Sequence, residues 1–416
     1  MTRRAARVEG EQMRQDFDAL SRIGATGDGG VNRPTFSDAH FAARHWFIKR
    51  AEAEGLETRR DAAGNHSAIL YPRSRRDAPV LLLGSHLDSV PMGGCYDGAI
   101  GVVAALHVLL AIKASGTELP FALEAIDFTD EEGTLLGLLG SEALAGTLTA
   151  ESLMAPRGGR NALVAGLERA GLREDRLHEA RRDPATLAGY VELHIEQGPR
   201  LERERIRIGV VTRIVGSRSF RIVLRGLGGH AGTMPMDARR DAAVAAARVI
   251  IAARDTVVSD FPDSVITVGD VRLEPGAFNV VPGLARLSLE FRSQNENELN
   301  AIQSAIFTRF RADAEAHGIE LEVTQVARWP LTVLDPAVIE AIERASAALQ
   351  LTTTRLASGA GHDAQALAPI TPTGMIFIPS VGGVSHSSHE YTAWEDVVNG
   401  ANLLLGTVQD WPTRTR

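Results

Sequence analysis

This sequence of 416 residues contains only one cysteine and no excess of basic residues. It also lacks an apolar run long enough to span a membrane. Cys95 has no second cysteine to pair with, so an intramolecular disulfide is excluded, which fits a reducing compartment. The longest apolar stretch, residues 98–112, is too short to span a bilayer and contains Gly101 and His107. We therefore expect this stretch to form a buried helix.

The balance of charge is acidic, which argues against a surface that binds nucleic acid. The formal net charge is −8, with 44 Lys and Arg residues against 52 Asp and Glu residues. Residues 1–4 carry positive charge, but no apolar segment follows them, which argues against a signal peptide. A length of 416 residues favours two domains. These features predict a soluble, cytoplasmic protein that binds neither nucleic acid nor a membrane.

Short apolar runs separated by helical segments predict an α/β fold for most of the chain. The expected strands are residues 79–85, 121–129, 190–195 and 375–378. Val80–Leu83 is an unbroken apolar run, which is typical of a strand buried on both faces. Helices are expected over residues 13–23 and 38–54, with Ser37 capping the second. The predicted architecture is a mostly parallel mixed sheet flanked by helices.

A different pattern begins near residue 212 and predicts a small α+β domain inserted into the first one. The strands and helices expected there are residues 219–225, 235–254, 264–273, 279–292, 296–317 and 319–326. Their order, β-α-β-β-α-β, is that of the ferredoxin-like motif. We therefore expect one discontinuous domain of residues 1–211 and 330–416, and an inserted domain of residues 212–329.

Potential metal ligands follow the predicted strands of the larger domain. They are His86, Glu131, Glu132, His194 and His386, together with Asp97 in a glycine-rich turn. Each has an ordinary explanation by itself, since a single histidine is often structural, adjacent glutamates are often solvated, and Asp-Gly is often only a turn. Ligands of open α/β sheets bind at the carboxyl ends of the strands. The joint occurrence therefore predicts that these side chains converge on one site.

The residue types at this predicted site indicate two divalent metal ions. Three histidines and two carboxylates suit Zn²⁺, with Mn²⁺, Co²⁺ and Ni²⁺ as alternatives. Five ligands are too many for one tetrahedral site with an open position, but they suit two ions about 3.5–4 Å apart that share a carboxylate. One of the adjacent glutamates can face the metals while the other acts as general base. Asp88, two residues after His86, can orient the His86 ring.

Several segments, in order along nearly the whole chain, resemble the signatures of one dinuclear-metal amidohydrolase family. It contains N-carbamoyl-L-amino acid hydrolases, allantoate amidohydrolases and β-ureidopropionases. The segments are 84–91 (GSHLDSVP), 94–98 (GCYDG), 128–133 (FTDEEG), 192–199 (ELHIEQGP), 229–232 (GHAG), 279–283 (NVVPG), 358–363 (SGAGHD) and 384–387 (VSHS). Aminoacylase-like and glutamate-carboxypeptidase-like metallopeptidases share the His-x-Asp and Glu-Glu elements, whereas His-Ile-Glu-Gln-Gly-Pro looks particular to the carbamoylase branch.

This resemblance implies a homodimeric enzyme that cleaves a C–N bond of an N-carbamoyl-L-amino acid or a related ureido acid. A metal-bridging water would be the nucleophile and Glu131 the general base. The implied metal ligands form two groups that share Asp97. They are His86, Asp97 and His194 for one ion, and Asp97, Glu132 and His386 for the other.

The resemblance also implies which residues meet the substrate. The inserted domain would act as a lid and dimerisation domain, and would supply His230 as a catalytic residue and Asn279 and Arg292 as substrate-binding residues to the partner subunit. Gln197 and Gly359 would complete the pocket. The residues around Arg292 support its role, because Arg292 lies on the strand face opposite Leu287, Leu289 and Phe291, where a guanidinium can bind a carboxylate bidentately.

Some features leave alternatives open. N-carbamoyl-L-amino acids are the first choice of substrate, followed by allantoate, β-ureidopropionate and ureidoglycolate. A dipeptidase or aminoacylase-like metallohydrolase is a second reading, against which Asn279, Arg292 and the Gln197 motif argue. A silent metal-binding homologue is a third, against which the retention of every expected ligand and of Glu131 argues. Thr134-Leu135-Leu136 departs from the Arg-Phe or similar residues common in the family, which bears on substrate shape.

A few polar residues near these motifs receive no metal-binding role. Cys95 is expected to be an inert packing thiol rather than a ligand. His389, three residues after His386, is not expected to bind metal, and His362 and Asp363 are left as structural or supporting residues.

Overall fold

The computed structural model describes residues 6–412, so the charged segment 1–4 lies outside the described residues. The chain divides into two compact units, a larger one of Met1–Thr212 with Val333–Arg416 and a smaller one of Arg213–Thr332. The apolar stretch near residue 100 forms α3 (Ala99–Ser115), which is buried along most of its length, as predicted. Within residues 6–412 no helix is long and apolar enough to cross a membrane.

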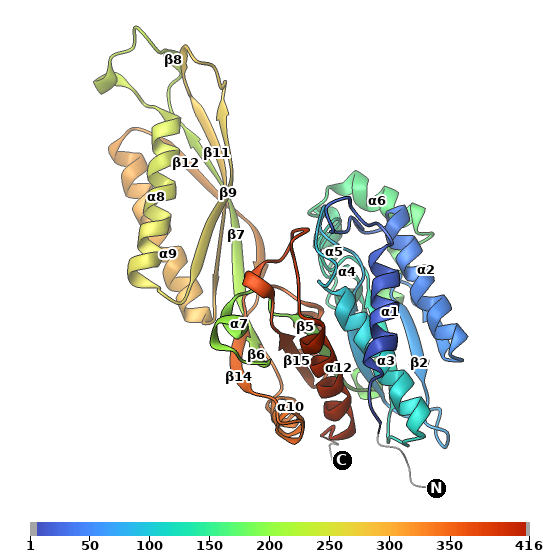
Figure 1. Cartoon of the computed structure of the whole chain (residues 1–416). Coiled ribbons are helices and arrows are strands. Elements are labelled where there is room, and N and C mark those ends of the chain that lie inside the picture. The colour runs from blue at the N-terminus through green and yellow to red at the C-terminus, as the bar shows by residue number, and fades with distance from the viewer. Residues whose placement is uncertain (1–5, 413–416) are drawn as a thin grey trace. The chain divides into compact units, whose positions relative to one another are not determined.

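A nine-stranded mixed sheet runs through the larger unit (Figure 1), in the order β1-β2-β4-β3-β5-β15-β6-β13, with β14 also pairing with β6. Its central strands are parallel: β4 (Ala122–Phe128), β3 (Val80–His86), β5 (Leu187–Ile195) and β15 (Thr373–Ile378). The flanking pairs β1–β2, β2–β4 and β15–β6 are antiparallel. The outer strands are β1 (Glu57–Arg60), β2 (His66–Leu70), β6 (Ile208–Ile214), β13 (Thr332–Val333) and β14 (Thr353–Ser358). The parallel centre confirms the α/β prediction, because the four expected strands are its members.

The helices of the larger unit begin and end close to the predicted residues where a prediction was made. They are α1 (Gly10–Ser21), α2 (Asp38–Ala53), α3, α4 (Leu139–Ala145), α5 (Ala150–Met154), α6 (Arg160–Arg169), α7 (Arg200–Glu204), α10 (Pro336–Ala348), α11 (Asp363–Leu367), α12 (Trp394–Gln409) and the 3₁₀ turns η1 (Glu174–Ala180), η2 (Pro184–Thr186) and η4 (Val381–Gly383). Ser37 caps α2 by accepting the His40 N–H at 3.2 Å, as predicted.

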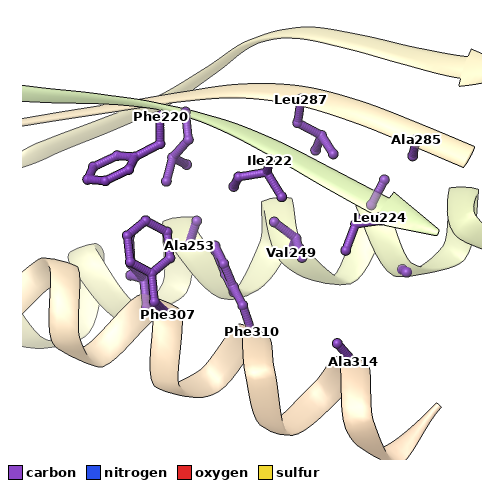
Figure 2. Packing of buried hydrophobic residues seen from close by; sticks show 14 of the residues in the cluster. Phe220, Ile222, Leu224, Val249, Ala253, Ala285, Leu287, Phe307, Phe310 and Ala314 are labelled. Atoms are coloured by element: carbon purple, nitrogen blue, oxygen red, sulfur yellow. The ribbon is translucent and has the colours of Figure 1, made fainter. Parts of the chain in front are cut away.

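The smaller unit follows the order β7-α8-β9-β11-α9-β12, with an antiparallel sheet ordered β12-β7-β11-β9. Its elements are β7 (Gly216–Arg225), α8 (Ala242–Asp260), β9 (Val265–Glu274), β11 (Leu284–Ser293), α9 (Glu296–Ala316), β12 (Glu320–Trp329), the short pair β8 (Gly229–His230) and β10 (Val280–Val281), and the 3₁₀ turn η3 (Met236–Ala238). Both helices cover the same face of this sheet. Figure 2 shows Phe220 and Ile222 of β7 facing Phe307 and Phe310 of α9 across a fully apolar core.

Two predicted elements of the smaller unit have wrong boundaries. The helix expected from residue 235 begins at Ala242, because the Asp241 carboxylate accepts the N–H groups of Ala243 and Val244 and so caps the helix there. The strand expected over residues 279–292 is split into β10 and β11, because Pro282 and Gly283 separate them. Local capping and a proline break thus outweigh the apolar periodicity.

A buried ion pair between Arg44 on α2 and Asp127 on β4 joins that helix to the strand that leads to the Glu131-Glu132 pair. The Arg44 Nε lies 2.7 Å from the Asp127 Oδ2, and both side chains are almost fully shielded from solvent. Arg44 also donates to the Phe128 carbonyl at 3.2 Å and to the Thr129 hydroxyl at 2.9 Å. Burial raises the pKa of Asp127 to about 6, although the charge of Arg44 opposes the shift.

Removing Arg44 should destabilise the larger unit strongly, because the Asp127 carboxylate would stay buried without a cation. Breaking such a pair typically costs about 3–5 kcal/mol. Arg44→Ala is therefore expected to lower the urea concentration at which half of the larger unit is unfolded. Tryptophan fluorescence would monitor the unfolding. The control is Lys49→Ala on the same helix, whose exposed pair with Glu52 at 2.9 Å should contribute less than about 1 kcal/mol. Equal shifts for the two variants would contradict this role of Arg44.

Candidate metal centre

Five of the side chains expected to bind metal lie together at the carboxyl ends of the central strands. His86 is the last residue of β3, His194 is near the end of β5, Glu132 follows β4, His386 follows β15, and Asp97 precedes α3. Their potential ligand atoms form two groups, His86 with Asp97 and His194, and Asp97 with Glu132 and His386. Within each group these atoms lie within 4.8 Å of one another. The Asp97 carboxylate belongs to both groups.

The Asp97 carboxylate lies between three imidazole rings. Its Oδ1 is 3.0 Å from the His194 Nε2 and 3.6 Å from the His86 Nε2, and its Oδ2 is 3.3 Å from the His386 Nε2. The Glu132 Oε2 is 3.6 Å from the same nitrogen of His386. Burial alone would raise the pKa of Asp97, but hydrogen bonds from His194 and His386 hold it well below its ordinary value. Asp97 is therefore an ionised carboxylate in contact with each histidine of the site.

Main-chain carbonyls fix the orientation of two of these rings. The His86 Nδ1 lies 3.0 Å from the Asp88 carbonyl oxygen, and the His194 Nδ1 lies 2.9 Å from the Ile195 carbonyl oxygen. A carbonyl can only accept, so each Nδ1 carries the proton. The Nε2 of each ring then faces Asp97, so Nε2 is the atom that would bind a metal, in exchange for any proton it shares with Asp97.

Asp88 supports the site in a way that differs from the prediction. Its main-chain oxygen orients the His86 ring, whereas its carboxylate oxygen lies 3.8 Å from the His86 Nδ1. The carboxylate instead accepts the Thr35 hydroxyl at 2.9 Å and the N–H groups of Glu131 and Glu132 at 3.4 and 3.3 Å. Asp88 therefore positions the glutamate pair.

The loop after β4 is organised by Asp130. This residue has a positive φ of 60°, and its carboxylate accepts the N–H groups of Leu135, Leu136 and Gly137 at 2.6–3.0 Å. Leu135 and Leu136 are buried in a hydrophobic cluster. Leu135 and Leu136 of the Thr134-Leu135-Leu136 departure are therefore core residues next to the Glu131-Glu132 pair in the chain.

Glu390 is a buried residue of the site that sequence reasoning missed. Its Oε1 accepts the N–H groups of Tyr96 and Asp97 at 2.9 and 3.0 Å, and its Oε2 accepts the Ser385 hydroxyl at 2.8 Å. It thereby fixes the Asp97 turn to the segment that carries His386. The only local signal is a carboxylate four residues after His386, which is too common a spacing to indicate a role.

His362, which the sequence left as a structural or supporting residue, lies beside the candidate metal-binding groups. Its ring packs edge-on against His194 with centroids 4.6 Å apart, and its Nε2 lies 2.8 Å from the Ser358 hydroxyl. It belongs to a further group with Glu192 and His194. Glu192 is already engaged, since it accepts the Ser85 hydroxyl at 2.7 Å and the Ala364 N–H at 3.0 Å. We read this group as support for His194.

The site contains several buried carboxylates close to one another, an arrangement that is costly unless cations bind there. The Glu131 Oε2 lies 3.5 Å from the His86 Nε2. Burial, followed by the neighbouring carboxylates, raises the pKa of Glu131 and of Glu132 well above the ordinary value. Divalent cations would offset this cost, and imidazole nitrogens with carboxylate oxygens are the donors that zinc and its neighbours prefer. The donor set therefore fits divalent metal ions.

Two residues predicted to bind substrate lie in the larger unit. Gln197, at a positive φ of 57°, donates from Nε2 to the Asp97 Oδ2 at 2.8 Å, so it contacts the metal-binding groups directly. Gly359 follows β14, and a Cβ atom there would meet no atom within 4 Å. The space beside Gly359 is thus open.

The other three predicted substrate residues belong to the smaller unit. His230 and Asn279 are neighbours, because β8 pairs with β10 and the Ala231 N–H donates to the Asn279 carbonyl at 2.9 Å. Arg292 lies on the open face of β11, as predicted, and its Nη2 is 2.8 Å from the Glu290 Oε1. The Arg292 guanidinium is therefore held by an ion pair with Glu290, which lies on the same face of β11.

Comparisons with known proteins agree on one family. A family model described as peptidase family M20/M25/M40 matches residues 82–410. An N-carbamoyl-L-amino acid amidohydrolase from Geobacillus stearothermophilus is 37% identical over 406 residues, covering 96% of this chain and 98% of the relative. A ureidoglycolate hydrolase from Oryza sativa subsp. japonica is 35% identical over 405 residues, covering 95% and 84%. A crystal structure of an amidase of the hydantoinase/carbamoylase family from Burkholderia multivorans has a TM-score of 0.85 at 32% identity, covering 97% and 98%.

Gly98 allows the Asp97 turn to approach His86, and its replacement should lower the amount of metal that the protein binds. Gly98 has φ +62°, and a Cβ atom there would lie 2.4 Å from the His86 Cε1 and Nε2. Gly98→Ala is therefore expected to displace the His86 ring and to lower bound metal by at least one ion per chain, measured by elemental analysis after dialysis. The control is Gly27→Ala, whose Cβ would meet no atom within 4 Å. Unchanged metal content in Gly98→Ala would remove His86 from the ligand set.

Proposed function

This chain belongs to peptidase family M20/M25/M40, and on that premise we propose that it is a metal-dependent amidohydrolase of N-carbamoyl-L-amino acids. The matches confirm the family resemblance that the motifs predicted, and the relatives named N-carbamoyl-L-amino acid amidohydrolase support a C–N bond other than a peptide bond as the target. The observation that carries the proposal is the pair of three-residue donor groups that share Asp97 beside the buried Glu131.

We propose two divalent ions, with Zn²⁺, Mn²⁺, Co²⁺ or Ni²⁺ compatible with the donors. His86, Asp97 and His194 would hold one ion, and Asp97, Glu132 and His386 the other. When bound, such ions polarise a carbonyl group and lower the pKa of water. They also favour the ionised form of Glu131, the form in which a general base acts.

Glu131 is the proposed general base. Its carboxylate lies beside His86 without belonging to either donor group, so it can accept a proton. It takes a proton from the water that attacks the carbonyl carbon and returns it to the nitrogen that leaves when the C–N bond breaks. The N–H groups of Glu131 and Glu132 are held by Asp88, which keeps the base and the ligand on the same loop.

The substrate's carboxylate is proposed to be bound by Arg292, with Asn279 and the catalytic His230 from the same unit. Adjacent placement of His230 and Asn279, and the open strand face that carries Arg292, support this role. Gln197 and Gly359 are proposed to complete the pocket. As an assembly we propose a cytoplasmic homodimer in which the smaller unit, as lid and dimerisation domain, serves the partner's site.

Ureidoglycolate is a second candidate substrate, favoured by the similarity to the Oryza sativa ureidoglycolate hydrolase. It shares with N-carbamoyl amino acids a ureido nitrogen on the carbon that carries the carboxylate, so the same groups would bind it. The two candidates differ in what that carbon carries besides nitrogen and carboxylate. A direct comparison of turnover separates them.

Turnover on a substrate panel tests the proposed function. The metal-loaded protein is expected to hydrolyse N-carbamoyl-L-amino acids or ureidoglycolate faster than N-acetyl amino acids and dipeptides, with allantoate and β-ureidopropionate as further members of the panel. Ammonia and amine release measure the rates. Cleavage of dipeptides or N-acetyl amino acids alone would overturn the substrate class, and a metal-loaded protein without turnover would support a silent homologue.

Glu131→Gln is the matched control for this panel, because it keeps the size of the side chain and removes its basicity. General-base catalysis typically contributes about 10²–10⁴-fold, so kcat should fall by at least 10²-fold. Metal content should stay the same, since Glu131 belongs to neither donor group. Near-normal turnover would assign the base elsewhere.

Arg292→Ala should chiefly raise KM for carboxylate substrates. The loss of one charge-assisted contact corresponds to roughly 10–150-fold. Arg286→Ala is the matched control, because Arg286 lies on the same open face of β11 and pairs with Glu274 at 3.1 Å. Substrate analogues with a neutral amide should respond little to Arg292→Ala. An unchanged KM for the carboxylate substrate would remove Arg292 from the site.

Mixed dimers test whether Arg292 acts across subunits. A dimer of one Glu131→Gln and one Arg292→Ala protomer would contain one site with both native residues if each site uses the partner's Arg292. Partial recovery of activity is then expected in verified heterodimers. If each subunit completes its own site, the mixture will show no recovery.

A further inference from the structure

A pocket of about 500 Å³ on the larger unit is lined by basic side chains. It lies between α2, the edge strand β1 with its neighbour β2, and the end of α6. The basic residues are Arg44, His45, Arg59, Arg60, His66 and Arg169, and none of the described lining residues is acidic. No lining residue belongs to the metal-binding groups. The pocket is therefore a separate feature of the larger unit.

Some of these charges are already balanced from outside the pocket. Arg44 pairs with the buried Asp127, whereas Arg169 pairs with Asp38 where both side chains are exposed, so Arg169 is only weakly neutralised. Arg59 reaches Glu124 at 3.1 Å, but both oxygens of Glu124 already accept the Arg182 amino groups at 2.5 and 2.7 Å. Two guanidinium groups thus share one carboxylate, which leaves one positive charge of this set unbalanced.

Arg60 is balanced less directly, through the charge of the neighbouring Asp61 and without an ion-pair contact. Its guanidinium donates to the Ala170 carbonyl, and it forms no ion pair with an acidic side chain of residues 6–412. Burial, followed by the charge of Arg44, lowers the pKa of Arg60, and the charge of Asp61 opposes this shift only in part. The His66 Nδ1 is shielded from solvent and has no hydrogen-bond partner in the described part of the chain. Burial lowers the pKa of His66 to about 3, so its ring is neutral and retains an N–H to donate.

We propose that this pocket binds a small organic molecule through a phosphate group, held chiefly by Arg60 with Arg59 and Arg169. Guanidinium groups match phosphate oxygens in pairs, and a dianion offsets more than one unbalanced cation. Phe41 and Ile48 line the same pocket and offer an apolar surface for the organic part. The volume lies within the range of small-molecule sites, about 300–1,000 Å³. A net charge of −8 weighs against a polyanion such as nucleic acid.

Calorimetric titration of the metal-loaded protein with phenyl phosphate and with inorganic phosphate, at constant ionic strength in chloride, tests this site. One molecule of phenyl phosphate per chain should bind, more tightly than inorganic phosphate. Arg60→Gln should weaken both by about tenfold or more, and Arg169→Gln should act in the same direction. Arg344→Gln is the matched control, because Arg344 is exposed and pairs with Asp410 at 2.8 Å outside the pocket. It should leave binding unchanged.

The same titrations distinguish this pocket from the metal centre, which can also attract phosphate. Binding that is unchanged in Arg60→Gln and Arg169→Gln would overturn the proposal and place the anion elsewhere. Equal weakening in Arg344→Gln would show unspecific charge attraction and would also overturn it. Phe41→Ala should weaken phenyl phosphate and spare inorganic phosphate, and equal losses for the two would overturn the apolar contact. The amidohydrolase activity of Arg60→Gln without phosphate should equal that of the wild type.

Discussion

The larger unit is organised around a buried carboxylate, that of Asp97, at the point where three imidazole rings meet. Asp97 is reached by His86, His194 and His386, and its main-chain N–H is held by Glu390. Each contact comes from a different part of the chain, so the position of Asp97 sets the relative positions of the strand ends. A buried cluster so rich in carboxylates is costly without cations, which is why the architecture is suited to divalent metals.

The parallel centre of the sheet explains why a few residues can build this site. Carboxyl ends of parallel strands meet at one edge, so the ends of β3, β4, β5 and β15 deliver their side chains to the same place. The surrounding polar groups then restrict each side chain to one role. Carbonyls hold the Nδ1 atoms of His86 and His194, while Asp88 holds the backbone of the Glu131-Glu132 pair. Preorganisation of this kind would let the proposed metal ligands and the proposed base act without rearrangement.

Charge is segregated within the larger unit. Acidic groups are concentrated at the strand ends, whereas basic side chains line the pocket beside β1 and β2. The buried ion pair of Arg44 and Asp127 connects these two regions. Arg44 lines the pocket, and Asp127 precedes Glu131 by four residues. The pocket and the Glu131-Glu132 loop therefore share a structural element, the Arg44–Asp127 pair.

Local sequence determined the central strands, the buried helix α3 and the set of side chains at the strand ends, because apolar runs, caps and strand-end motifs are properties of neighbouring residues. The tertiary structure alone decided what holds that set in place. Glu390 reaches Asp97 across 293 residues, and Thr35 reaches Asp88 across 53. No periodicity records such contacts, because each depends on the chain already being folded. The edge strand β1 was equally hidden, since it is mostly exposed and lacks an alternating pattern, and its place is set by pairing with β2.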